Sequence, residues 1–275
     1  MIYKIKDNNI IICDKTQFNP KHILECGQVF RFGIDEDGNY FVISKDKKAT
    51  IIENETNYII KSNAPNYFVH YFDLNRDYNQ IKKQLETDPI LKPMIKYGFG
   101  IRILNADPVE MIFSFVISQN NNIKRIQKII EKLCEAGTAS EDFKAFPTIS
   151  ELLNQTPDFF SSLGAGYRDK FLLTIAQTLK KVHIEKIKNL SSEQLYDFLL
   201  SLHGVGPKVA SCILLFGFGK TNKFPVDTWI EQVYYNHYSN EKRNRKQIQE
   251  YFENKYGEYS GIAQQYLFYY EREKN

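Results

Sequence analysis

Cysteine is scarce in this chain of 275 residues, and its placement excludes two kinds of site. Cys13, Cys26, Cys134 and Cys212 stand singly, and no two of them form a C-x-x-C pair. Structural zinc sites and cysteine-ligated iron–sulfur clusters need cysteines in close, regular spacing. We therefore expect reduced thiols, no zinc site and no iron–sulfur cluster.

An excess of one charge and long apolar runs are also missing. The 36 basic and 33 acidic residues give a formal net charge of +3, so a nucleic-acid surface would have to be local. No uncharged apolar run approaches the length of a membrane span, and the first residues alternate apolar side chains with lysine, unlike a signal peptide. We expect a cytoplasmic protein that makes no membrane contact.

The chain has two kinds of periodicity, with no internal repeat and no low-complexity segment. Helical periods replace strand patterns beyond Asn66, and the switch predicts an α+β protein with an antiparallel sheet domain at 1–95 and an all-α domain at 96–275. The predicted strands are short β-branched or aromatic runs between turn residues: Ile10–Cys13, Val29–Phe32, Tyr40–Ile43, Thr50–Ile52 and Tyr58–Ile60.

A hairpin between two helices, at residues 202–208, carries the strongest chemical signal. Apolar side chains recur at helical spacing on both sides of it. Between the helices lie Gly204, Val205 and Gly206, where missing side chains allow positive φ and close approach of the backbone amides. Pro207 suits the first turn of the second helix, whose free N–H groups form an anion site. The hairpin therefore fits a nucleic-acid phosphate.

Lys208 and Asp227 are the candidate reactive groups. A cation in the first turn of a helix opposes the macrodipole, and partial burial adds to this, so we expect a lowered pKa and a neutral, nucleophilic amine. Asp227 follows a proline and a valine and precedes an apolar-periodic run, so it is expected to cap a helix and to face Lys208. Together they suggest attack on an electron-poor carbon. Taken singly, a G-x-G turn, a helical lysine and a capping aspartate are ordinary structural features.

In this order, the segment from Leu202 to Lys208, the apolar helix and Pro225-Val226-Asp227 resemble the helix-hairpin-helix and Gly/Pro-Asp signature of the DNA glycosylase superfamily. The resemblance implies a TBP-like N-terminal sheet followed by a helical glycosylase domain. It also implies bifunctional chemistry, because a lysine at position 208 marks members that cleave the glycosidic bond and then nick the strand.

Gly27 lies in the segment ECGQVFRF, where a glycine beside aromatics marks a turn or a close backbone approach. A turn is the simplest interpretation. The segment also resembles the G-Q-x-F-R-W/F motif of 8-oxoguanine DNA glycosylases. That resemblance implies that the Gly27 carbonyl accepts the N7 hydrogen that oxidised guanine carries and guanine lacks. An unpaired buried acceptor is costly, so one donor can discriminate between the two bases.

Two loops are candidates for contacts to the opposite strand. In DPVEMIFSFVISQNNNIKRI, a capped helix runs into three asparagines, which otherwise form an ordinary loop. Its resemblance to the family implies that Asn120 fills the gap left by the extruded base and that Arg125 pairs with the orphaned cytosine. The segment LGAGYR, otherwise a helix end and a loop, implies by the same resemblance that Tyr167 is a wedge and that Arg168 binds that cytosine.

The last expected helix carries Gln264 and Phe268 one turn apart on a shared face. It can be explained as an aromatic-rich helix that closes the core. It also resembles the family's G-x-A-Q-x-x-L-F ending, which implies that Gln264 binds the Watson–Crick edge of the flipped base and that Phe268 stacks on its face. Cys212, one turn beyond Lys208, would form the opposite wall.

The resemblance thus implies a monomeric enzyme that acts on double-stranded DNA containing 8-oxoguanine opposite cytosine. It flips the base, attacks C1′ with Lys208, and nicks the strand by β-elimination. No cofactor is required, although Na⁺ or K⁺ on the carbonyls of Leu200, Leu202 and Val205 is expected as a structural ion. One departure concerns Trp229, where eukaryotic relatives have a phosphate-binding histidine. Two alternatives remain: an alkylpurine DNA glycosylase of the same superfamily, and a non-catalytic helix-hairpin-helix module.

Overall fold

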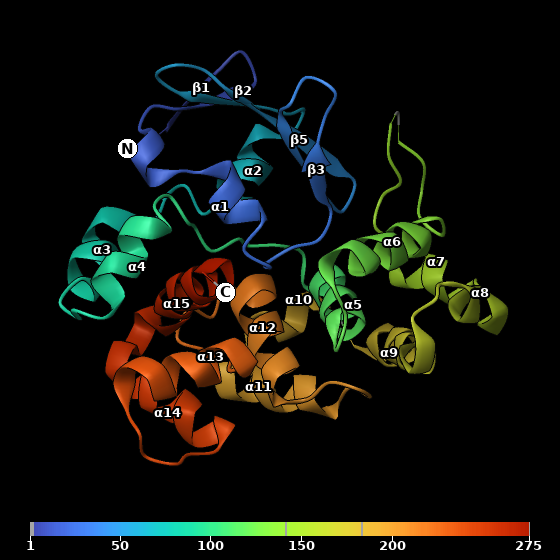
Figure 1. Cartoon of the computed structure of the whole chain (residues 1–275). Coiled ribbons are helices and arrows are strands. Elements are labelled where there is room, and N and C mark those ends of the chain that lie inside the picture. The colour runs from blue at the N-terminus through green and yellow to red at the C-terminus, as the bar shows by residue number, and fades with distance from the viewer. Residues whose placement is uncertain (1–2, 141, 183, 275) are drawn as a thin grey trace.

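The computed structural model describes residues 3–140, 142–182 and 184–274, and a sheet lies over a larger body of helices (Figure 1). The sheet is antiparallel throughout, in the order β1-β2-β6-β5-β4-β3. Its strands are β1 (Tyr3–Lys6), β2 (Asn9–Ile12), β3 (Phe32–Ile34), β4 (Tyr40–Ser44), β5 (Lys47–Glu53) and β6 (Tyr58–Lys61). The predicted α+β class is confirmed.

One face of the sheet is buried because apolar side chains alternate along the strands. Ile10, Ile60 and Ile51 are paired in register across three strands and are at most 2% exposed. Helices α1 (Pro20–Leu24) and α2 (Pro65–Tyr71) contact β4 and β2 respectively.

The strand predicted at Val29–Phe32 is wrong for its first three residues, because β3 begins at Phe32. The preceding segment is tied elsewhere: the Gln28 side chain accepts a hydrogen bond from Leu104 N and donates to Arg102 O. Strand β1 was missed, since its alternation of lysine with apolar residues was interpreted only as evidence against a signal peptide.

Three helices that carry or adjoin the site begin with side-chain caps, and the cap predicted at Asp227 is among them. Asp107 caps α5, Ser191 and Gln194 form a capping box on α11, and Asp227 caps α13. The remaining helices begin and end as follows: α3 (Tyr78–Leu85), α4 (Leu91–Tyr97), α5 (Pro108–Ser118), α6 (Ile123–Cys134), α7 (Ile149–Leu153), α8 (Pro157–Ser162), α9 (Asp169–Lys181), α10 (Ile184–Ile187), α11 (Ser192–Ser201), α12 (Pro207–Phe218), α13 (Thr228–Val233), α14 (Arg245–Tyr256) and α15 (Ser260–Lys274). Helices α2–α4 precede residue 98, and the domain boundary near residue 95 stays a prediction.

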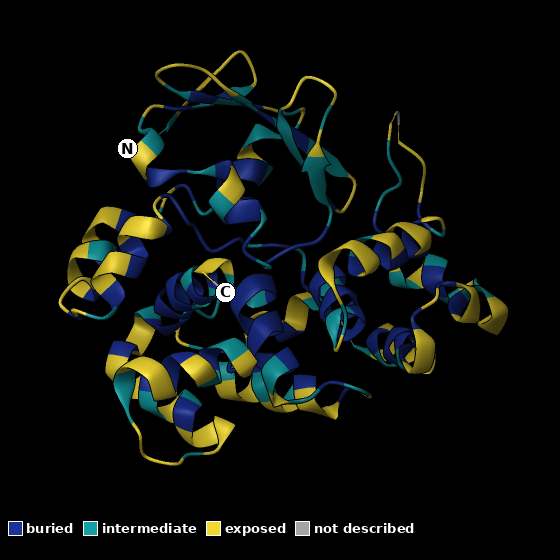
Figure 2. Ribbon diagram, in the orientation of Figure 1, coloured by how far each residue is buried: buried dark blue, intermediate teal, exposed yellow. Residues whose placement is uncertain are grey.

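Helices α12 and α15 lie in the middle of the molecule and are largely dark blue in Figure 2. Gly261 of α15 lies directly against Leu215 of α12, at a distance that leaves no space for a Cβ. The side chain of Gln265 donates to the carbonyl of Cys26 at 2.7 Å, across 239 positions of sequence. The last helix therefore lies on a turn from the first thirty residues.

The side chain of Arg102 links segments that are distant in the sequence by hydrogen bonds to their backbone carbonyls. Its side chain is completely buried. The guanidinium donates to four backbone carbonyls, those of Gln17, Phe72, Asp73 and Arg76. Among the described residues, no helix is long and apolar enough to cross a membrane.

Candidate active site

The hairpin between α11 and α12 requires glycine at one position. Gly204 has φ of 84°, and a Cβ there would lie 2.3 Å from the ring of Phe171. Gly206 does not use positive φ; it is extended, with φ of −96°, and forms the N-cap of α12. The amide of Val205 donates to Leu202 O at 3.1 Å, which closes the turn. Of the two hairpin glycines, only Gly204 adopts the positive φ that the sequence predicts.

Lys208 is the second residue of α12 and is half-buried. Its Nζ lies 5.7 Å from the centre of the Phe115 ring on α5. One carboxylate oxygen of Asp227, Oδ1, accepts from Ile230 N at 3.0 Å and so caps α13, as predicted. Lys208 and Asp227 line the same two cavities, so the fold brings the predicted nucleophile and carboxylate together.

The predicted lowering of the Lys208 pKa is wrong. Burial does lower it, but the neighbouring Cys212 sulfur and the Asp227 carboxylate raise it by more, and the net pKa of Lys208 is raised. Burial also raises the pKa of the Cys212 thiol, which is therefore neutral near pH 7. Asp227 is thus the charge that stabilises the ammonium form at neutral pH. The facing Asp227 carboxylate favours the charged amine, and this effect opposes the lowering expected from burial and the helix terminus.

All four predicted base-binding residues surround one small cavity of about 40 Å³, together with Lys208 and Asp227. Gly27 has φ of 83°, and a Cβ on it would lie 3.6 Å from the Phe268 ring. The Oε1 atom of Gln264 is buried and has no hydrogen-bond partner in the part of the chain that the structure describes. Buried acceptors are rarely left unpaired, so this atom indicates a place for a ligand donor. The remaining lining residues are Cys26, Phe115, Phe216, Pro225 and Gln265.

A larger cavity of about 680 Å³ adjoins the first at Lys208 and Asp227. Asn120 and Gly206 line it on one side. Arg245 and Lys246, at the start of α14, line it too and were not singled out from the sequence. Their signal was weak, because a basic pair at a helix start is common on any surface. Trp229 is half-buried in the first turn of α13.

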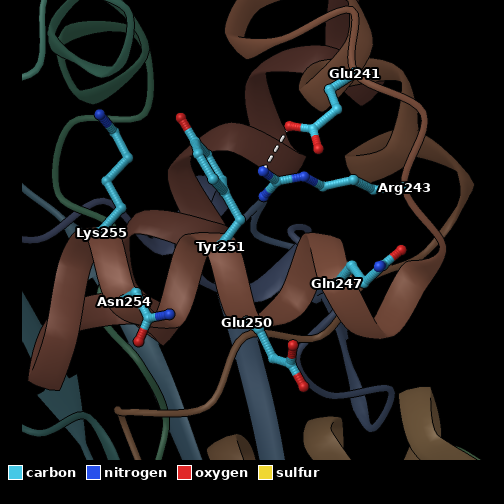
Figure 3. A pocket seen from close by; sticks show the side chains of 7 residues that line it. All are labelled: Glu241, Arg243, Gln247, Glu250, Tyr251, Asn254 and Lys255. Carbon is cyan, nitrogen blue, oxygen red and sulfur yellow. Dashed lines mark hydrogen bonds and ion pairs between the residues drawn. The ribbon is translucent and has the colours of Figure 1, made fainter.

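A third cavity, of about 520 Å³, includes Tyr251 and Lys255 on α14 and the loop before that helix (Figure 3). Arg243 forms an ion pair with Glu241 at its rim. Glu250 lines this cavity and the 680 Å³ cavity. None of the predicted site residues lines it, so it lies outside the candidate site.

The four predicted opposite-strand residues lie where the α5–α6 loop meets the α8–α9 loop. Asn120 has a positive φ of 44°. Arg125 donates to Gly164 O at 3.1 Å, and Tyr167 is 58% exposed, as a wedge would have to be. Arg168 is 4% exposed and donates to the carbonyls of Ala165, Gln119 and Asn120. Cytosine binding by Arg168 stays a prediction and would require it to release these carbonyls.

Two residues that hold the Gly27 turn were also missed. Gln265 and Arg272, both on α15, donate to the carbonyls of Cys26 and Glu25. Local periodicity contains no sign of these contacts, because both partners lie more than two hundred residues away in sequence.

Comparison with known proteins identifies the family of this chain. Residues 10–112 match the model of the 8-oxoguanine DNA glycosylase N-terminal domain, and residues 113–258 match that of the HhH-GPD superfamily base excision DNA repair protein. A probable N-glycosylase/DNA lyase of Methanothermobacter thermautotrophicus is 31% identical over 229 residues, which are 74% of this chain and 73% of that protein. The N-glycosylase/DNA lyase OGG1 of Arabidopsis thaliana is 31% identical over 66% of this chain, and the match spans about half of the plant protein, 55%.

Among solved structures, the 8-oxoguanine glycosylase/lyase of Clostridium acetobutylicum, in complex with double-stranded DNA containing cytosine opposite 8-oxoguanine, covers 100% of both chains. Its TM-score is 0.92 at 37% identity. The two family models, the relatives and the solved structure agree on the family and on the fold. The chain belongs to the 8-oxoguanine DNA glycosylase family of the HhH-GPD superfamily of base excision DNA repair proteins.

Proposed function

We propose that this protein is a bifunctional DNA repair glycosylase that excises 8-oxoguanine opposite cytosine and then nicks the strand. One observation carries the proposal: the unpaired Oε1 of Gln264 shares a small cavity with Gly27, Lys208 and Asp227. A base recognised there would be in contact with the nucleophile. We also propose that it acts in the cytoplasm, where fractionation of cells should find it with the DNA.

Base flipping is the first step, because a duplex hides both C1′ and the base edge, and unstacking costs a few kcal/mol. The small cavity, at about 40 Å³, has room for no more than a few waters and must open to admit a purine. Phe268 and Cys212 would then flank the base. Gln264 would bind its Watson–Crick edge, and the Gly27 carbonyl would accept the N7 hydrogen.

The chemical steps follow from Lys208 and Asp227. The lysine first loses a proton, and its neutral nitrogen then forms a bond to C1′ while the glycosidic bond breaks and the base departs with the bonding electrons. Asp227 stabilises the positive charge that develops on the sugar. The C1′–O4′ bond of the sugar ring then breaks, O4′ takes up a proton, and the lysine nitrogen forms a protonated imine with C1′. This imine acidifies the C2′ hydrogen, whose loss expels the 3′ phosphate and cuts the strand.

A structural Na⁺ or K⁺ would fit the hairpin, although no step depends on it. Among the described residues, no hydrogen bond reaches the carbonyl of Leu200 or that of Val205, while Leu202 O accepts from Val205 N. Free carbonyls at a helix end suit a monovalent cation. Replacement of Na⁺ and K⁺ by tetramethylammonium at constant ionic strength is expected to weaken DNA binding. Unchanged DNA affinity would contradict the proposed ion site.

Borohydride trapping on a duplex with 8-oxoguanine opposite cytosine tests the proposal. Wild type is expected to form a covalent adduct, and Lys208→Gln is expected to form none while it still binds DNA. Lys220→Gln is a matched control, because Lys220 lies just beyond the end of the same helix and bonds Leu190 O. It should retain the adduct.

The same assay separates the alternatives. An alkylpurine glycosylase or a non-catalytic module would give no adduct with wild type. Excision should also be slower when adenine, guanine or thymine replaces the opposite cytosine, and equal rates with all four bases would remove the roles given to Arg125 and Arg168.

A further inference from the structure

Helix α15 presents two kinds of side chain to the base cavity. Gln264, Gln265 and Phe268 line the cavity itself. Gln265 and Arg272 hold the turn that carries Gly27: Gln265 Nε2 donates to Cys26 O, and Arg272 Nη2 donates to Glu25 O, each at 2.7 Å. Two consecutive carbonyls just before Gly27 are thereby fixed to the helix that carries the stacking ring.

Arg272 contacts both walls of the cavity. Its guanidinium lies 5.3 Å from the centre of the Phe268 ring, within the range of a cation–π contact. A Cβ on Gly27 would lie 3.6 Å from Arg272 Nη1, so the guanidinium also lies beside the Gly27 backbone. Glu273 also accepts from the guanidinium, with Oε1 at 2.8 Å from Nη2 and 3.2 Å from Nε.

This arrangement determines the space between Gly27 and Phe268. The planar, rigid guanidinium makes several directed contacts at once, which the flexible ammonium of lysine cannot reproduce. A hydrogen bond weakens steeply when its distance or angle departs from the optimum. If Gly27 O distinguishes 8-oxoguanine from guanine, the discrimination depends on the residues that fix the turn carrying that carbonyl.

We propose that Arg272 is a positioning residue for base selection: it sets the spacing between the Gly27 carbonyl and the Phe268 ring without touching the base. The proposal rests on the proposed function and adds a determinant of substrate specificity to it. Arg272 follows the motif that ends at Phe268, and it does not line the base cavity.

Single-turnover kinetics on two substrates test this role. The first is a duplex with 8-oxoguanine opposite cytosine, and the second has a preformed abasic site opposite cytosine, which has no base to select. Arg272→Met is expected to slow base excision by about 10- to 100-fold, as a misplaced contact does. Nicking at the abasic site should change by less than about twofold, because Lys208 and Asp227 are untouched.

The ratio of excision rates for 8-oxoguanine and guanine should fall with Arg272→Met, while DNA affinity stays unchanged. Arg272→Lys should lie between wild type and Arg272→Met, and Gln265→Met should show the same split because it releases the neighbouring carbonyl. Lys274→Met is the matched control: Lys274 lies on the same helix but over the rings of Tyr97 and Tyr270, and both activities should persist.

Equal losses on the two substrates, or unchanged base excision, would overturn the role of Arg272. If Arg272→Met does not fold, Arg272→Lys and Gln265→Met decide the question, and both must show the split. Failure of the proposed function is a separate result, in which wild type excises no 8-oxoguanine.

Discussion

The charge on Lys208 depends on groups from several elements packed around it. Asp227 at the start of α13 and Cys212 on α12 raise its pKa, whereas burial and Arg245 on α14 lower it. Because the net pKa is raised, the ammonium form dominates at neutral pH. Only a small fraction of the molecules then carries a neutral Lys208 amine, the form that the proposed attack on C1′ needs. The observed rate should therefore depend on the deprotonation of Lys208.

Imine formation is therefore expected to speed up with rising pH, by about tenfold per unit, until the pKa of Lys208 is reached. Asp227→Asn removes the charge that raises this pKa, so its rising limb should move to lower pH although its maximal rate falls. Asparagine also caps helices well, so α13 should survive. Borohydride trapping in single-turnover reactions between about pH 6 and pH 10 should show a wild-type rate that still rises at the upper end and an Asp227→Asn rate that levels off at lower pH.

A limb that stays in place in Asp227→Asn would show that another group controls the lysine. The position of Lys208 next to Asp227 could be predicted from motif order. Its protonation could not, since the pKa depends on distances to Asp227, Cys212 and Arg245 that only the folded chain defines.

Helix α5 contains a buried acid that links it to the sheet. Glu110 lies in the first turn of this helix, where acidic side chains are common. It is 3% exposed, accepts from Lys45 N at 3.0 Å, and lies 4.0 Å from Arg31 Nη1. Burial raises its pKa to about 7, because Arg31 offsets only part of the desolvation cost.

The free energy of unfolding should respond to this shift. Between about pH 4.5 and pH 7 the unfolded chain ionises Glu110 while the folded chain keeps it protonated. This group's stabilisation is therefore complete below the unfolded pKa and is lost as pH rises towards 7. Relative to Glu110→Gln, wild type should lose up to about 1.4 kcal/mol per pH unit, as measured by urea unfolding.

Glu151 provides the control for this prediction. It has the corresponding place in α7, but hydrogen bonds from Thr148 lower its pKa. Its contribution to stability is lost only below the usual carboxyl range, so Glu151→Gln should differ from wild type by a constant amount from pH 5 to pH 7. A constant difference for Glu110→Gln as well would show that Glu110 is ionised in the folded protein.

At the scale of elements, caps and periodicity predicted α5, α11, α12 and α13 well, because those signals are local. The strand predicted at Val29–Phe32 was wrong before Phe32, because β-branched and aromatic residues suit any buried extended segment and not only a strand. Its neighbour Gln28 pairs with the backbone at 102 and 104, so the segment never joins the sheet before Phe32.

The whole molecule is held together by contacts between distant segments, and Arg102 is the strongest case. Arg102→Leu would leave four buried carbonyls without their donor, and we expect a loss of about 3–5 kcal/mol in the free energy of unfolding. Arg76→Leu is the control. The Arg76 side chain is 34% exposed and pairs with Asp73, so its loss should cost no more than about 1 kcal/mol.

Urea unfolding followed by fluorescence, together with residual excision activity, measures both variants. If sheet and helices form one cooperative unit, the two signals should share a midpoint in wild type and in each variant. Separate midpoints would contradict the coupling assigned to Arg102.

The order of motifs along the chain predicted which residues belong to the site, but not how they meet. Gly27 and Phe268 approach each other because α15 packs against the turn after α1, and hydrogen bonds from Gln265 and Arg272 fix that packing. Such contacts span most of the sequence and leave no local period, so only the structure reveals them.

The position of α15 has a consequence for synthesis. A ribosome makes Gly27, the hairpin and Lys208 before it reaches α15, so the growing chain contains the proposed nucleophile and the proposed N7 acceptor without Gln264 and Phe268. On the proposed roles, the base cavity is complete only once translation has passed this helix. A message truncated before α15 would yield a polypeptide that carries the amine but lacks the side chains proposed to bind and stack on the base.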